Sequence, residues 1–108
     1  MPEPSTPLKP ADFHILLTLV DGPRHGYEIM KEVEADSGAM VRLEVGTLYR
    51  ILARLLEDGL LKEAEFDGRR RNYNLTRAGR HALTAEAGRM ARMVDQLRRR
   101  KLLPPAEA

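Results

Sequence analysis

The residues of this sequence best suited to chemistry are cations and hydroxyls, and they gather in two short segments. In the first, Arg69, Arg70 and Arg71 directly follow an Asp67-Gly68 pair. Three adjacent cations repel one another, and a bound anion relieves that repulsion. A nucleic-acid duplex offers closely spaced phosphates, and neutralising them releases counterions. We therefore expect this segment to bind a polyanion, the alternative being a solvated turn.

The second segment runs from residue 45 to residue 54. Leucines recur there at helical spacing, which predicts a helix with one buried face. Its other face carries Gly46, Thr47, Tyr49, Arg50 and Arg54. Glycine lets a backbone approach phosphate closely, hydroxyls bind phosphate or base, and arginine can bond guanine through two N–H groups, as we expect of Arg50. We expect DNA contacts from these five residues, the alternative being an ordinary amphipathic helix with a solvated outer face.

Charge is divided unevenly along the 108 residues. Residues 1–65 hold 7 Lys and Arg against 12 Asp and Glu, whereas residues 66–108 hold 11 against 4. This asymmetry favours a polyanionic partner for the second half, although long helices also carry solvated arginines.

Cysteine is absent, which fits a reducing cytoplasm. No apolar run approaches the roughly 18–20 residues that span a bilayer, so we expect no membrane partner.

Catalysis and metal binding are not expected. The histidines at positions 14, 25 and 81 are scattered and match no zinc-ligand spacing. The two serines, Ser5 and Ser37, have no base or oxyanion loop implied beside them. We therefore expect a protein that is not an enzyme and that carries no cofactor and no metal.

The order of predicted elements positions the two cationic segments. Pro10 opens a first helix with an inward stripe, and a turn follows at 21–23. The stripe consists of Phe13, Leu16, Leu17 and Val20, widened by Ile15 and Leu19. We then expect a helix from about 24–26 to Gly38, a very short strand at 40–43 and a helix at 45–58. Two strands should follow at 60–66 and 70–75, around the Asp67-Gly68 turn. A long helix should then run from the Thr76 cap to about residue 101. Strand alternation points Arg70 away from Arg71 and Tyr73, so Arg69 and Arg70 are the expected DNA contacts of the hairpin and Arg71 is expected to bond within its own domain.

These elements predict a mainly α fold with a small β-hairpin, that is, a winged helix-turn-helix followed by one long helix. In such a fold the second helix of the pair enters the major groove. We expect a disordered tail at 1–7, the winged helix-turn-helix at 8–76, a C-terminal dimerisation helix at 77–102 and a second tail at 103–108.

The long helix carries an apolar stripe at spacings of four and three residues, typical of a helix that packs along a partner. Its members are Leu83, Ala87, Met90, Val94 and Leu97. We expect them to form the seam of a homodimer, which would also present two recognition helices to successive major grooves about 34 Å apart. The alternative is a helix that folds back on its own domain.

Several motifs together resemble the PadR family of bacterial transcriptional regulators. They include Phe13-His14-Ile15-Leu16-Leu17, Gly22-Pro23-Arg24-His25-Gly26-Tyr27-Glu28-Ile29, Gly46-Thr47-Leu48-Tyr49 and Arg70-Arg71-Asn72-Tyr73-Asn74-Leu75-Thr76, in the family's order and spacing over about residues 8–100. The resemblance implies a cytoplasmic homodimeric repressor that releases its operator when a small effector or another signal changes the dimer. Position 50, where many relatives carry proline, is arginine here, so the operator preference of relatives cannot be transferred.

The resemblance also implies that Gly26 and Tyr27 contact backbone phosphate, the alternative for Tyr27 being packing against the third helix. Some short relatives bind flat drugs between aromatic side chains, but this sequence has no tryptophan and its last helix has no Phe or Tyr. Met90 and Met93 could line an adaptable pocket, although methionine at helical spacing is more often core. A small-molecule effector is therefore possible but unidentified. A winged-helix module that binds another protein remains the alternative function.

Overall fold

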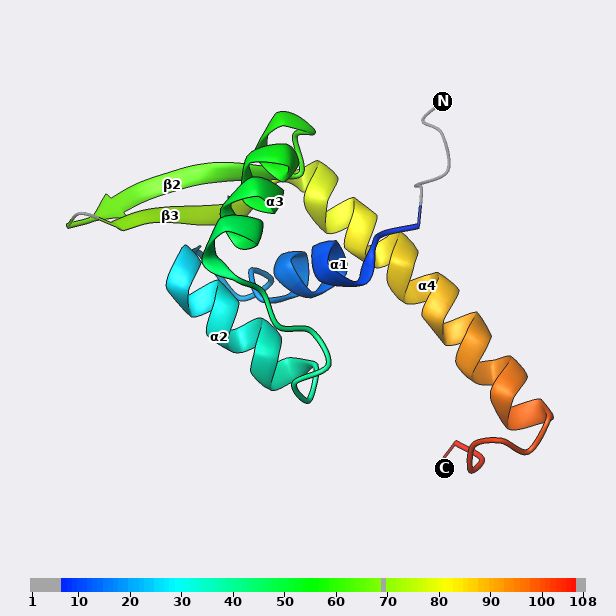
Figure 1. Cartoon of the computed structure of the whole chain (residues 1–108). Helices are drawn as coiled ribbons and strands as arrows, with labels where there is room; N and C mark the ends of the chain where they lie inside the picture. The colour runs from blue at the N-terminus through cyan, green and yellow to red at the C-terminus, as the bar shows by residue number, and fades with distance from the viewer. Residues whose placement is uncertain (1–6, 69, 107–108) are drawn as a thin grey trace.

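Four helices and three strands make up the part of the chain that the structure, a computed structural model, describes, residues 7–68 and 70–106. In order they are α1 (Pro10–Leu17), β1 (Arg24–His25), α2 (Gly26–Asp36), α3 (Val45–Glu57), β2 (Leu61–Asp67), β3 (Arg70–Leu75) and α4 (Arg77–Arg99) (Figure 1). The predicted class, mainly α with a small β-hairpin, is confirmed. Of the disordered tails expected at 1–7 and 103–108, residues 1–6 and 107–108 lie outside the described residues.

Helix α1 packs into the hydrophobic core, and Leu17 is the one side chain of its expected inward stripe that is exposed. Pro10 begins it as predicted, because the fixed φ of proline suits the first helical turn. Ile15, Leu16 and Leu19 are fully buried, whereas Leu17 is 40% exposed. The segment is apolar on nearly every side, so its sequence alone does not indicate which face of the helix becomes buried. Packing against the other helices determines that face.

The two helices that follow begin and end at local signals read from the sequence. Helix α2 is followed by Gly38 at φ 61°, and α3 by Gly59 at φ 78°, a left-handed conformation that glycine adopts without strain. Helix α3 buries Leu48, Leu52 and Leu55 as predicted. Its opposite face, with the polar residues, is exposed.

The sheet is antiparallel, with strand order β1-β3-β2. Strands β2 and β3 form the predicted hairpin, with Tyr73 and Leu75 on its buried side. The strand predicted at 40–43 is wrong, since that segment has no regular structure and its Val41 backbone bonds to Ser37 Oγ instead. The third strand is β1, which pairs Arg24 with Tyr73. A short segment with alternating apolar and polar residues forms a strand only where it can pair with the unpaired edge of another strand. In this structure β1 already occupies that edge of β3.

Helix α4 starts against the domain and then runs away from it (Figure 1). Thr76 caps it as predicted, since its Oγ1 accepts a hydrogen bond from the Gly79 amide at 3.0 Å. Leu83, expected in the dimer seam, is 7% exposed and belongs to the domain's own core. That expectation is corrected, because the first turns of α4 pack against the body of the domain. No helix in the described ranges has the length and apolar character needed to cross a membrane.

Candidate nucleic-acid interface

Three elements that are separate in the sequence meet around one surface hollow of about 580 Å³, which we call the wing-side hollow. The elements are the start of α2, the first turns of α3 and the start of β3. The residues lining it are His25, Gly26, Tyr27, Tyr49, Arg70, Arg71 and Tyr73. Four expected contact residues, Gly26, Tyr27, Tyr49 and Arg70, are thus brought together. Tyr27 is 56% exposed and Tyr49 is 46% exposed, so both side chains are partly open to solvent.

The position of Tyr49 depends on Gly26. A Cβ atom at position 26 would lie 2.6 Å from Tyr49 Oη and 2.9 Å from its Cζ, closer than real Cβ contacts. Gly26 is buried, so its side-chain space is occupied by the tyrosine ring and not left open to phosphate. The glycine of one motif therefore makes room for the tyrosine of another.

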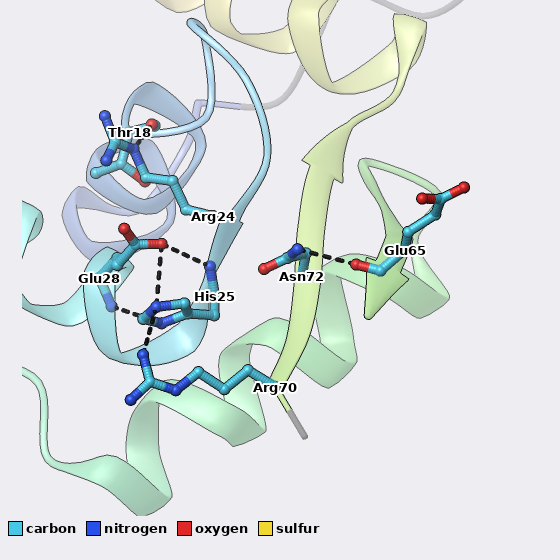
Figure 2. Close-up of polar contacts among 7 residues, drawn as sticks. All are labelled: Thr18, Arg24, His25, Glu28, Glu65, Arg70 and Asn72. Carbon is cyan, nitrogen blue, oxygen red and sulfur yellow. Dashed lines mark hydrogen bonds and ion pairs between the residues drawn. The ribbon is translucent and has the colours of Figure 1, made fainter. Parts of the chain in front are cut away.

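The start of α2 is held by a reciprocal cap. His25 Nδ1 accepts a hydrogen bond from the Glu28 amide at 3.3 Å, and Glu28 Oε1 accepts one from the His25 amide at 3.2 Å (Figure 2). Arg70 of β3 approaches the same ring, with Nη1 2.9 Å from His25 Nε2. This contact places Arg70 of the hairpin beside the start of α2. The spacing of His25 and Glu28 was a usable sequence signal, but histidine is an uncommon capping residue.

Further bonds fix β1 and the hairpin. Arg24 Nε donates to the Thr18 carbonyl at 2.8 Å, and Asn72 Nδ2 donates to the Glu65 carbonyl at 2.9 Å (Figure 2). Arg71 Nε lies 2.6 Å from Glu63 Oε1, so the expectation that Arg71 bonds within its own domain is confirmed. Arg69 lies outside the described residues, and its expected contact stays a prediction.

Tyr73 forms the floor of the wing-side hollow. It is only 3% exposed, and burial raises the pKa of its hydroxyl above the usual value near 10. The phenol therefore stays protonated at neutral pH and adds no negative charge to a surface expected to meet an anion.

The first turn of α3 is open. Among the described residues, none lies within 4 Å of a Cβ built on Gly46, and Glu44, the residue before the helix, forms no side-chain cap. The first amides of the helix are thus left without a side-chain partner, an arrangement that favours an anion. Thr47 is half-buried beside them. This geometry fits the roles expected of Gly46 and Thr47, which remain predictions.

Arg50 and Arg54 lie on the other flank of α3. They line a second hollow of about 350 Å³, which we call the α1-side hollow, together with Lys9, Ala11, Asp12 and Ile51. Arg54 Nη2 donates to both Asp12 oxygens, at 2.7 and 2.9 Å, and this bond is the main reason that the pKa of Arg54 is raised. Arg54 was expected to contact DNA, whereas in this structure its guanidinium is bound by a carboxylate of α1.

Sequence reasoning missed Lys9 and Asp12. Asp12 is 5% exposed, and a buried carboxylate on a helix indicates a paired cation, but the partner is 42 residues away. No group of three or more side chains that could hold a metal ion was found among the residues described.

A helix pair whose second helix has an open polar face, followed by a projecting hairpin that completes a three-stranded sheet with β1, defines the winged-helix class. Residues 15–85 match the family model described as the transcriptional regulator PadR-like family. The match spans more than half of the chain, and the chain belongs to this family of transcriptional regulators.

Two relatives and one solved structure illustrate the similarity. A 37.1 kDa protein in transposon TN4556 of Streptomyces fradiae is 46% identical over 83 residues, 77% of this chain, which spans only 24% of that protein's length. The transcriptional regulator Rv3488 of Mycobacterium tuberculosis is 42% identical over 76 residues, 68% of each chain. The fold is shared with Bacillus subtilis PadR, solved with operator DNA, at a TM-score of 0.62 and 22% identity over 70% of this chain and 45% of that one.

Proposed function

We propose that this protein is a cytoplasmic homodimeric repressor that binds a palindromic operator through α3 and the β2–β3 hairpin. The observation that carries the proposal is the convergence of Tyr27, Tyr49 and Arg70 on one hollow beside the open start of α3. In this arrangement α3 enters the major groove, while the start of α2 and the hairpin hold backbone phosphates. The operator complex of the B. subtilis protein supports this use of the shared fold.

The homodimer is proposed from the far part of α4. Ala87 is exposed, Met90 is 41% exposed and Leu97 is 37% exposed, while Val94 between them is half-buried. These apolar side chains keep a three- and four-residue spacing, and burying them against a second copy would contribute about 25 cal/mol per Å² of apolar area. Two copies joined through α4 would offer two α3 helices to one duplex.

The test is the salt dependence of duplex binding by the full chain. Fragments selected from the host genome give a candidate operator, and fluorescence anisotropy gives its affinity from low to moderate salt. We expect the logarithm of the affinity to fall linearly with the logarithm of salt concentration. A salt-insensitive complex with a protein partner, and no duplex binding, would support the winged-helix interaction module instead.

The hairpin contribution is tested with Arg69→Ala combined with Arg70→Ala. If both side chains touch phosphate, the salt slope becomes shallower by about 1.8 for each bound chain, and all duplexes bind more weakly. Arg92→Ala is the matched control, because this exposed arginine lies on α4 two positions from Met90 and off the apolar stripe. A slope equal to that of the control would exclude the two hairpin contacts.

A further inference from the structure

Helix α3 has a hollow on each flank, and the proposed function uses only one of them. Tyr49 lines the wing-side hollow and Arg50, its neighbour in the chain, lines the α1-side hollow. In Figure 1 the hairpin extends to the left of α3 and α1 lies to its right. The two hollows share no lining residue, so they are separate surfaces beside the same helix.

The α1-side hollow carries an excess of positive charge. Its lining includes three cations, Lys9, Arg50 and Arg54, and one anion, Asp12. Arg54 and Asp12 neutralise each other through two hydrogen bonds, and Asp58 adds a longer contact to Arg54 at 3.9 Å. Lys9 and Arg50 are exposed, and neither side chain has an ion pair or hydrogen bond with any described residue. Two unneutralised cations from two different elements therefore face one hollow.

The dimensions of a duplex suggest what fills it. An α-helix with its side chains is about 10–12 Å across, close to the roughly 12 Å width of the major groove. A helix seated in that groove has a phosphate backbone along each of its flanks. The wing-side hollow meets one backbone, and the α1-side hollow then meets the other.

We propose that Lys9 and Arg50 form a second phosphate site, which binds the DNA strand opposite the one held by the hairpin. This inference rests on the proposed function and extends it to a residue of the N-terminal segment, Lys9. It also moves Arg50 from the guanine contact expected from the sequence to a backbone contact. Asp12 is a positioning residue here, because it holds Arg54 at the wall of the hollow.

The test compares Lys9→Ala and Arg50→Ala with the unsubstituted protein on the selected operator and on an unrelated duplex of equal length. Each variant should weaken binding by the same factor on both duplexes and reduce the salt slope by about 0.9 for each bound chain. Lys9→Arg keeps the charge and should keep both affinity and slope. Arg92→Ala again controls for the loss of one exposed charge. Lys9 forms no side-chain cap on α1, so its replacement should leave the thermal midpoint unchanged.

Three outcomes would overturn the inference. Lys9→Ala with unchanged affinity and slope would remove Lys9 from the site. A loss for Arg50→Ala confined to one base pair of the operator would return Arg50 to base recognition. If Lys9→Arg weakens binding as much as Lys9→Ala does, then the shape of the side chain at position 9 matters and its charge does not. Failure of the unsubstituted chain to bind any duplex would instead defeat the proposed function itself.

Discussion

The two halves of α4 share one apolar stripe but have different environments. In the inner half, residues 77–86, Gly79, Ala82 and Leu83 are buried against the domain. In the outer half, residues 87–99, no residue is fully buried, and Met93 is 66% exposed. The apolar stripe runs through both halves without a break, and only the inner half has something to pack against. A continuous stripe therefore shows which side of a helix is apolar, but not which partner covers it.

Gly79→Ala should have the largest effect and tests the inner half. A Cβ at position 79 would lie 2.1 Å from the Leu60 carbonyl oxygen and 3.1 Å from Leu75 Cδ2. The backbone cannot yield easily there, because the Leu60 carbonyl also accepts a hydrogen bond from the Thr76 amide. We expect a loss of about 3 kcal/mol in the free energy of unfolding, measured by denaturant titration. A loss below about 1 kcal/mol would mean that α4 is less tightly joined to the domain than described.

Val94→Asp should have the next largest effect and tests the outer half. The substitution places a charge in the middle of the proposed seam, where burial of an unpaired carboxylate is unfavourable. We expect a monomer, by sedimentation or light scattering, with much weaker DNA binding and an intact winged-helix domain. Thr84→Asp, on an exposed position of the same helix outside the stripe, is the control. A dimer that persists in Val94→Asp would place the interface elsewhere.

Glu86→Gln tests the boundary between the inner and outer halves of α4. Glu86 Oε1 accepts hydrogen bonds from the Leu8 amide at 3.0 Å and from Arg89 Nη2 at 2.7 Å, and these contacts lower the pKa of Glu86 below its ordinary 4.5. A carboxylate with a lowered pKa stabilises the fold above its ordinary pKa, and this stabilisation is lost as the pH falls through the lower value.

We therefore expect the glutamine variant to have a slightly lower thermal midpoint at neutral pH. The difference from the unsubstituted protein should shrink below about pH 4.5. Thermal unfolding followed by circular dichroism across this range measures it. A constant difference at all pH values would mean that the charge of Glu86 is not what joins the N-terminal segment to α4.

Gly88→Ala should have the smallest effect, and an opposite sign to Gly79→Ala. Only Arg92 Nη1, at 3.8 Å, lies within 4 Å of a Cβ at position 88, so the added methyl group has room. Alanine in a helix interior is favoured over glycine by about 0.5–1 kcal/mol, and we expect a gain of that size in the free energy of unfolding. If Gly88→Ala weakens dimerisation instead, then Gly88 lies within the seam and allows close approach of the second copy.

The sequence by itself determined the elements whose signals are local. Pro10, Thr76 and the glycines at 38, 59 and 68 act through their own backbone geometry or through a neighbour three residues away, so the helix boundaries and the hairpin turn followed from them. The leucine spacing of α3 fixed its buried face. These local signals, in the correct order, were enough to predict the winged-helix class.

Tertiary structure decided whatever depends on residues far apart in the chain. Packing buried Leu16 and left Leu17 exposed, and it buried Leu83 within its own domain. Pairing with β3 made β1 the third strand of the sheet. Packing also placed Tyr49 in the space left by Gly26 and bound Arg54 to Asp12, 42 residues away. The periodicity of the sequence determines the face of its own helix on which each apolar or charged side chain lies. The partner it meets depends on how the helices pack, which no local pattern encodes.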